Sequence, residues 1–198
     1  MKMLKLIKTI HFRRIREGRT NYKKRLNILI SNKPRLVVRK SLKNISAQLT
    51  DYNEDGDLIK VSASSRELKK LGWKANYGNI PASYLVGYLL GKKAVKKKIK
   101  RAILDIGLHP STKGSRIYAV VKGALDSGLN IPVGSEMLPS NDDVKGTRIS
   151  NHALMLSKDK DNYSKYFSDY LENDLVPEDL PKHFDEIKSV IEKSYKSE

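Results

Sequence analysis

Apolar and polar residues alternate in three runs after residue 34, and this period of two predicts β-strands. The first run, residues 35–40, is rich in β-branched residues and follows Pro34, while residues 45–52 and 58–63 repeat the alternation. Residues 53–57 contain an Asp-Gly pair, and glycine supplies the positive φ that a hairpin turn needs. We therefore expect three strands, of which the last two form an antiparallel hairpin.

The spacing of apolar residues becomes helical after residue 79. Asn79 suits an N-cap position, and Pro81 falls in the first turn, where a missing N–H costs nothing. The first half of this predicted helix is apolar on nearly all sides and should be buried. Its second half carries a lysine face, from Lys92 to Lys100, which could either contact phosphate or remain solvated.

Two further elements complete the predicted domain. The apolar run at residues 102–106 predicts a short buried strand, and residues 115–127 predict a helix closed by Gly128. A hairpin followed by helix, strand and helix predicts an α/β domain with helices on the faces of a mixed sheet. Residues 158–198 again carry apolar residues at helical spacing, which predicts a helical extension.

Basic charge is concentrated at the N-terminal end. The 198 residues carry a net charge of +17, and residues 1–50 hold fifteen lysines and arginines against one acid, Glu17. Residues 158–198 hold eleven acids against seven bases. Such a gradient is expected when one end lies along a phosphate backbone, whereas solubility alone needs no asymmetry. We predict an extended basic RNA-binding arm at 1–25 that orders on its partner, an α/β domain at 26–157 and an acidic extension at 158–198.

Composition excludes several classes of function. The chain has no cysteine, which removes disulfides, thiolate metal sites and cysteine nucleophiles and suits a cytosolic protein. No run approaches the roughly 18 apolar residues of a membrane span. The four histidines lack metal-ligand spacing, and no nucleophile or phosphate-loop motif occurs. We therefore expect no metal, cofactor, membrane partner or small-molecule substrate.

Candidate RNA-binding residues fall in three segments. The arginines of the arm suit bidentate phosphate contacts, while Tyr22 could stack on a base or pack against the domain. The loop after the first strand can present donors from a rigid support, although Arg39 could instead form a salt bridge. The third segment precedes the helix at 115–127, whose N–H groups favour phosphate, although Gly114 and Ser115 could serve only as turn and cap. The predicted residues are Arg13, Arg14, Arg16, Arg19, Thr20, Asn21, Tyr22, Lys23, Lys24, Arg25, Arg35, Arg39, Lys40, Ser41, Asn44, Lys113, Gly114, Ser115 and Arg116.

An ordered set of short strings resembles a known family. The strings lie at 13–22, 33–41, 65–68, 72–74, 91–94, 103–110, 113–116, 122–126, 131–132 and 138–140. Together they resemble the archaeal and eukaryotic branch of large-subunit ribosomal protein family eighteen, which binds 5S rRNA. The resemblance implies a ribonuclease-H-like α/β arrangement and a structural, non-catalytic protein of the large ribosomal subunit in the cytoplasm. Its partners would be 5S rRNA, large-subunit rRNA in the central protuberance and neighbouring ribosomal proteins.

Other functions stay open on the sequence. A non-specific nucleic-acid-binding protein, or a coat for anionic membranes, would bind any polyanion with the same salt dependence. A nuclease would need several carboxylates around metal ions. Turn chemistry explains Asp55 and Asp57, and Asp105 stands near a strand end without carboxylate companions. Trp73 could stack on a nucleotide, but a lone tryptophan more often packs inside the protein.

Overall fold

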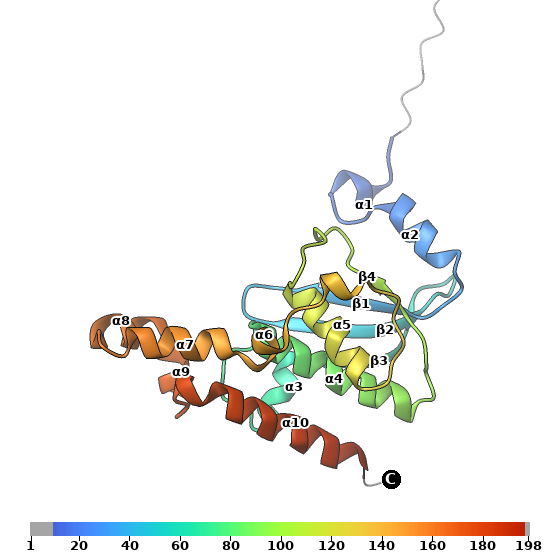
Figure 1. Ribbon diagram of the computed structural model, residues 1–198. Coiled ribbons are helices and arrows are strands. Elements are labelled where there is room, and N and C mark those ends of the chain that lie inside the picture. The colour runs from blue at the N-terminus through green and yellow to red at the C-terminus, as the bar shows by residue number, and fades with distance from the viewer. Residues whose placement is uncertain (1–9, 197–198) are drawn as a thin grey trace, which may run out of the picture.

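A mixed sheet of four strands forms the centre of the computed structural model, which describes residues 10–196 (Figure 1). The strands are β1 (Arg35–Lys40), β2 (Ile45–Asp51), β3 (Leu58–Ser64) and β4 (Ile103–Asp105). Their order is β3-β2-β1-β4. Strand β2 is antiparallel to both of its neighbours, β1 and β3, and β4 is parallel to β1. The predicted strands, hairpin and mixed α/β class are confirmed.

The alternation along the strands gives the sheet two unlike faces, because successive side chains point to opposite sides. One face is the core face, and it carries Leu36, Val38, Ile45, Ala47 and Leu49, each at most 1% exposed. The opposite face, called here the polar face, carries Arg35, Arg39, Ser46, Gln48 and Thr50. A slip of one residue would exchange the two sets, so burial of the apolar set fixes the register.

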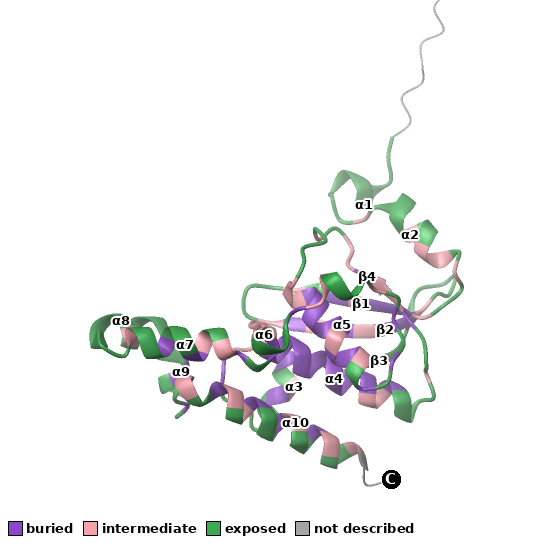
Figure 2. Cartoon of the chain, in the orientation of Figure 1, coloured by how far each residue is buried: buried purple, intermediate pink, exposed green. Residues whose placement is uncertain are grey.

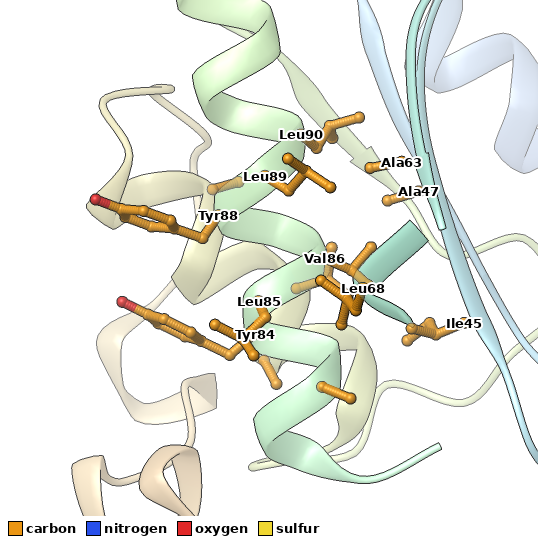
Figure 3. Close-up of a cluster of buried hydrophobic side chains, with 14 of the residues drawn as sticks. Ile45, Ala47, Ala63, Leu68, Tyr84, Leu85, Val86, Tyr88, Leu89 and Leu90 are labelled. Atoms are coloured by element: carbon orange, nitrogen blue, oxygen red, sulfur yellow. The ribbon is translucent and has the colours of Figure 1, made fainter. Parts of the chain in front are cut away.

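Two helices cover the core face of the sheet. Helix α4 (Ile80–Lys96) lies against β2 and β3, and α5 (Arg116–Asp126) lies against β1 and α4. Figure 3 shows Val86 and Leu90 of α4 pointing towards the strands, whereas Tyr84 points away from them. The first half of α4 is buried on nearly all sides, as its sequence predicts.

The ends of these helices follow local sequence signals. The side-chain oxygen of Asn79 accepts the N–H of Ala82 at 2.8 Å, which confirms the predicted N-cap of α4. Gly128 follows α5 with a φ of 107°, a conformation that a side chain would strain. Between β3 and α4 lies α3 (Ser65–Lys70), which begins with a capping box formed by Ser64 and Glu67.

Helices α4 and α5 approach each other at two glycines. A Cβ atom added at Gly87 would overlap the backbone carbonyl of Val120, and one added at Gly123 would overlap the carbonyl of Tyr84. Backbone atoms cannot move aside as a flexible side chain can. The close contact between the two helices therefore depends on glycine at both positions.

The described part of the arm differs from the expected extended conformation. It contains two short helices, α1 (Arg13–Arg16) and α2 (Tyr22–Leu29), and the side chain of Asn21 caps α2 by accepting the N–H of Lys24 at 3.0 Å. Neither helix buries a residue, so no apolar period marks them in the sequence. Residues 1–9 of the predicted arm lie outside the described residues.

The extension at residues 158–198 is helical, as predicted, and further short helices that the sequence analysis did not predict precede it. The elements of this C-terminal part are η1 (Ser135–Met137), α6 (Asn141–Lys145), α7 (Thr147–Leu156), α8 (Lys160–Tyr166), α9 (Ser168–Leu171), η2 (Pro177–Asp179) and α10 (Leu180–Lys196). Helix α10 lies against α4 on the side away from the sheet, where the ring of Phe184 lies 5.5 Å from that of Tyr84. The hydroxyl of Tyr88 donates to Glu192 of α10 at 2.7 Å. Within residues 10–196, no helix has the length and hydrophobicity needed to span a membrane.

The glycine contact generates a stability prediction. We expect Gly123→Ala to lower the free energy of unfolding by about 1–3 kcal/mol or more, because α5 must move away from α4. Gly134→Ala is the matched control, since its nearest contact is the Cγ of Glu136 at 3.6 Å and its φ is −69°. It should change the free energy by less than about 0.5 kcal/mol in urea denaturation. Equal losses in both variants would contradict the close-contact account.

The extension generates a pH prediction. Burial, and then a hydrogen bond to the Glu178 carboxylate, raise the pKa of Tyr163 to about 12. The stabilisation from this phenol is therefore present below about pH 10 and lost as the pH rises through about 12. The phenolate absorbance of wild type minus that of Tyr163→Phe should titrate near pH 12. Glu178→Gln should move this midpoint downwards, and a midpoint near 10 in wild type would contradict the interaction.

Candidate nucleic-acid interface

A cavity of about 590 Å³ separates the arm from the polar face of the sheet. The arm contributes Arg14, Arg19, Lys24 and Arg25, and the sheet contributes Arg35, Arg39, Gln48 and Thr50. In Figure 2 the arm is largely exposed, whereas the strands below it include buried segments. The cavity thus brings residues from two of the three predicted RNA-binding segments to one place.

Arg35 is the most deeply buried charge at this site, with its side chain 3% exposed. Its guanidinium pairs with Asp105 at 2.9 Å and with Asp57 at 2.5 Å. Asp105 also faces Arg39 at 3.6 Å and accepts the N–H of Gly107 at 2.8 Å. A buried charge must be paired, so these carboxylates hold the arginines in place.

The two aspartates at this site face cations. The Asp105 carboxylate is occupied by two arginines and a backbone N–H. Across residues 10–196, no group of three histidine or acidic side chains could hold a metal ion. Asp57 belongs to the turn before β3 and faces arginines, so both acids act as counter-charges for cations.

The arm cations have weak contacts of their own. Arg13 and Arg19 both lie 3.1 Å from Glu17, and Nε of Arg14 donates to Thr20 at 2.9 Å. Exposed pairs of this kind contribute only about 0–1 kcal/mol, so a phosphate can replace them. The ring of Tyr22 lies 5.5 Å from that of Phe12 and is 38% exposed, which leaves part of it open for stacking.

Beyond Arg39 the polar face continues into a second groove, of about 330 Å³. Arg39, Lys40 and Arg66 line it, and its lining within the described chain contains no acid. Burial, and then the nearby charges of Lys40, Arg39 and Arg116, lower the pKa of His109 below its usual value. With three cationic side chains in its lining, the second groove suits an anion.

Some predicted RNA-binding residues also have structural roles. The hydroxyl of Ser41 accepts the N–H of Asn44 and donates to its carbonyl, both at 3.0 Å, which holds the turn between β1 and β2. Arg116 donates to the carbonyls of Ser41 and Gly78 at 3.0 and 2.9 Å. Lys113 pairs with Glu136 at 3.0 Å. Contact of these residues with RNA stays a prediction.

Other residues that could have contacted RNA make contacts within the protein instead. Trp73 is 2% exposed and stacks on His183 with ring centroids 5.2 Å apart, which confirms the expectation that it packs inside the protein. On the lysine face of α4, Lys93 pairs with Glu67 at 2.6 Å, and Lys97 donates to the carbonyl of Lys60 at 2.7 Å. These two lysines hold α4 against its neighbours.

Sequence reasoning missed several residues of the polar face. Gln48 and Thr50 line the cavity, and Ser46 and Arg66 line the second groove. Alternation marked the outward positions of β2, but nothing local indicated that the arm would lie over them. Arg66 is the second residue of α3, and only the tertiary fold brings it to the same groove as Lys40.

The buried ion pair generates a prediction. Asp105→Asn leaves Arg35 buried with one charge partner fewer, and it should lower the free energy of unfolding by about 3 kcal/mol. Asp185→Asn is the control, because its pair with Lys145 spans 3.6 Å and is half-exposed. That control should change the free energy of unfolding by less than about 0.5 kcal/mol in the same urea titrations. If the two variants lose the same stability, Asp105 does not anchor the site.

Comparisons with known proteins identify the family. The sequence model for ribosomal large subunit proteins 60S L5 and 50S L18 matches residues 8–101 and 95–134. The large ribosomal subunit protein uL18 of Methanococcus maripaludis is 53% identical over 182 residues, covering 92% of this chain and 94% of that protein. The family supplies RNA-binding structural components of the cytoplasmic large ribosomal subunit, and it is not a family of enzymes. The resemblance read from the sequence is confirmed, and the chain belongs to the uL18 family of large ribosomal subunit proteins.

Proposed function

We propose that this ribosomal protein binds 5S rRNA and helps attach it to large-subunit rRNA in the central protuberance. One observation carries the proposal: the arm and the polar face of the sheet converge on a cavity whose lining holds six cationic side chains and only two carboxylates. Single strands and loops of RNA are recognised by basic side chains for the phosphates and by polar side chains for the bases. Arg25, Arg39, Gln48 and Thr50 offer both kinds of group together.

The arm supplies the electrostatic part of this proposal. Residues 1–50 hold most of the excess positive charge of the chain. Each phosphate that a basic side chain neutralises releases condensed counterions, which favours binding at low salt. The weak pairs around Glu17 hold Arg13 and Arg19 loosely, so these side chains exchange readily between Glu17 and RNA.

The opposite side of the molecule supports the same orientation. The arm and α10 lie on opposite sides of the sheet (Figure 1). The extension at residues 158–198 is acidic, and an acidic surface repels a phosphate backbone. We assign rRNA to the arm side and neighbouring ribosomal proteins to the side of the extension.

Non-specific nucleic-acid binding is the second candidate. It is favoured by the exposed arm, because exposed lysines and arginines contact any phosphate backbone. Selectivity separates the two functions: a specific binder prefers 5S rRNA to a tRNA pool of similar charge at every salt concentration, whereas a non-specific binder does not.

We predict the effect of removing the arm charges. Replacing Arg13, Arg14, Arg16 and Arg19 by glutamine should weaken binding to 5S rRNA at least about tenfold and reduce the slope of log affinity against log salt by roughly 3 to 4. The control replaces Lys158, Lys160, Lys165 and Lys182 by glutamine, which removes the same charge from the extension. It should leave affinity and slope nearly unchanged.

The measurement is a salt titration of purified protein with 5S rRNA and with the tRNA pool. Equal binding of the two RNAs by wild type would favour the non-specific function. Equal losses in the arm variant and the control variant would show that net charge, and not the arm, determines binding.

A further inference from the structure

The cavity under the arm carries more positive charge than its own acids neutralise. Its lining holds six cationic side chains, Arg14, Arg19, Lys24, Arg25, Arg35 and Arg39, against two carboxylates. Asp105 is fully engaged with Arg35, Arg39 and a backbone N–H. Like charges gathered in a partly enclosed space repel one another, so the cavity attracts a further anion.

Asp57 pairs with two of these six cations. Its carboxylate lies 2.9 Å from Arg25 of α2 and 2.5 Å from Arg35 of β1, and so bridges the arm to the sheet. The Asp57 side chain is 26% exposed, whereas that of Arg35 is 3% exposed. The side chain of Arg25 is 36% exposed, so both Asp57 and Arg25 are accessible, whereas the buried guanidinium of Arg35 is fixed.

Arg35 has hydrogen-bond donors at the bridge that are not yet used within the described chain. Among the described residues, neither Nε nor Nη2 of Arg35 has a hydrogen-bond partner, although the side chain is almost fully buried; Nη2 meets Asp57 only as an ion pair. The hydroxyl of Thr50 also has no hydrogen-bond partner within residues 10–196; Thr50 is 4% exposed and stands opposite Arg35 in the register of β1 and β2. Buried polar groups without partners cost about 1–3 kcal/mol each, so the arrangement with Asp57 satisfies this site incompletely.

We propose that a phosphodiester of the bound RNA takes the place of the Asp57 carboxylate between Arg25 and Arg35. In the free protein, Asp57 stands in for that phosphate and holds α2 against the sheet. In the complex, the phosphate bridges the two arginines and Asp57 moves outward with its turn. This inference rests on the proposed RNA-binding function and adds the place and the mode of one contact.

Size and position favour an RNA strand as the source of this phosphate. A cavity of about 590 Å³ lies within the range of roughly 300–1,000 Å³ typical of sites for whole small molecules, so it has room for more than a lone ion. Gln48 and Thr50 offer polar groups beside it, and the second groove continues from Arg39. A strand can therefore pass from the arm across the polar face.

The proposal predicts that removing the charge of Asp57 strengthens RNA binding. Because Asp57 competes with the phosphate, Asp57→Asn should strengthen binding to 5S rRNA by about three- to tenfold. Asp51→Asn is the matched control, since it removes the same charge from the same hairpin, where Asp51 faces Lys60 at 3.6 Å. It should strengthen binding clearly less, through net charge alone.

A double-mutant cycle with Arg25→Gln separates this competition from the opposite role. If Asp57 competes with phosphate, Arg25→Gln weakens binding more in the Asp57→Asn background than in wild type, because the competing pair is already gone. If Asp57 instead orients Arg25 for RNA, Arg25→Gln weakens binding less in that background. Thermal unfolding of all variants checks that the fold is kept, because Asp57→Asn leaves the buried Arg35 with Asp105 as its remaining charge partner.

The outcomes distinguish this inference from the proposed function. Selective binding of 5S rRNA, together with equal effects of Asp57→Asn and Asp51→Asn or a cycle of the opposite sign, would overturn the inference alone. Equal binding of 5S rRNA and the tRNA pool, with the expected cycle, would overturn the proposed 5S selectivity and keep the phosphate site.

Discussion

The cavity between the arm and the sheet depends on the pairing of one buried guanidinium. Arg35 lies under the arm with two carboxylates, and removing a charge from water is costly unless its partners are close. Those partners come from different parts of the chain: Asp105 ends β4, and Asp57 lies in the turn before β3. One side chain therefore holds the parallel strand, the hairpin and, through Arg25, the arm around a single cavity.

The two faces of the sheet differ in what they contact. Its core face packs against α4 and α5, which approach each other closely at Gly87 and Gly123. Its polar face carries charged and amide side chains that a buried core would not tolerate. Helix α10, which belongs to the acidic extension, packs on the side of α4 away from the sheet and thus lies far from the arm. The steep charge gradient along the sequence thus becomes a gradient across the folded molecule, with the basic end on the side of the arm.

Local signals in the sequence predicted much of the fold. Alternation marked the strands, the Asp-Gly pair marked the hairpin, and Asn79 and Gly128 marked helix ends, because each signal acts within a few residues. The site was harder to predict from the sequence. Arg35 and its partner Asp105 are 70 positions apart, and Arg116 reaches a carbonyl 75 positions away, so only the fold shows these pairs. The helices of the arm escaped prediction because they bury nothing that would leave an apolar period.

The central claim is that rRNA lies on the polar face and not on the side of α10. Photo-crosslinking from single positions in the 5S rRNA complex tests it most directly, with benzoylphenylalanine placed at Gln48 on the polar face or at Glu186, which is exposed on α10. The account predicts RNA adducts from position 48 and none from position 186. Adducts from position 186, with none from position 48, would contradict it.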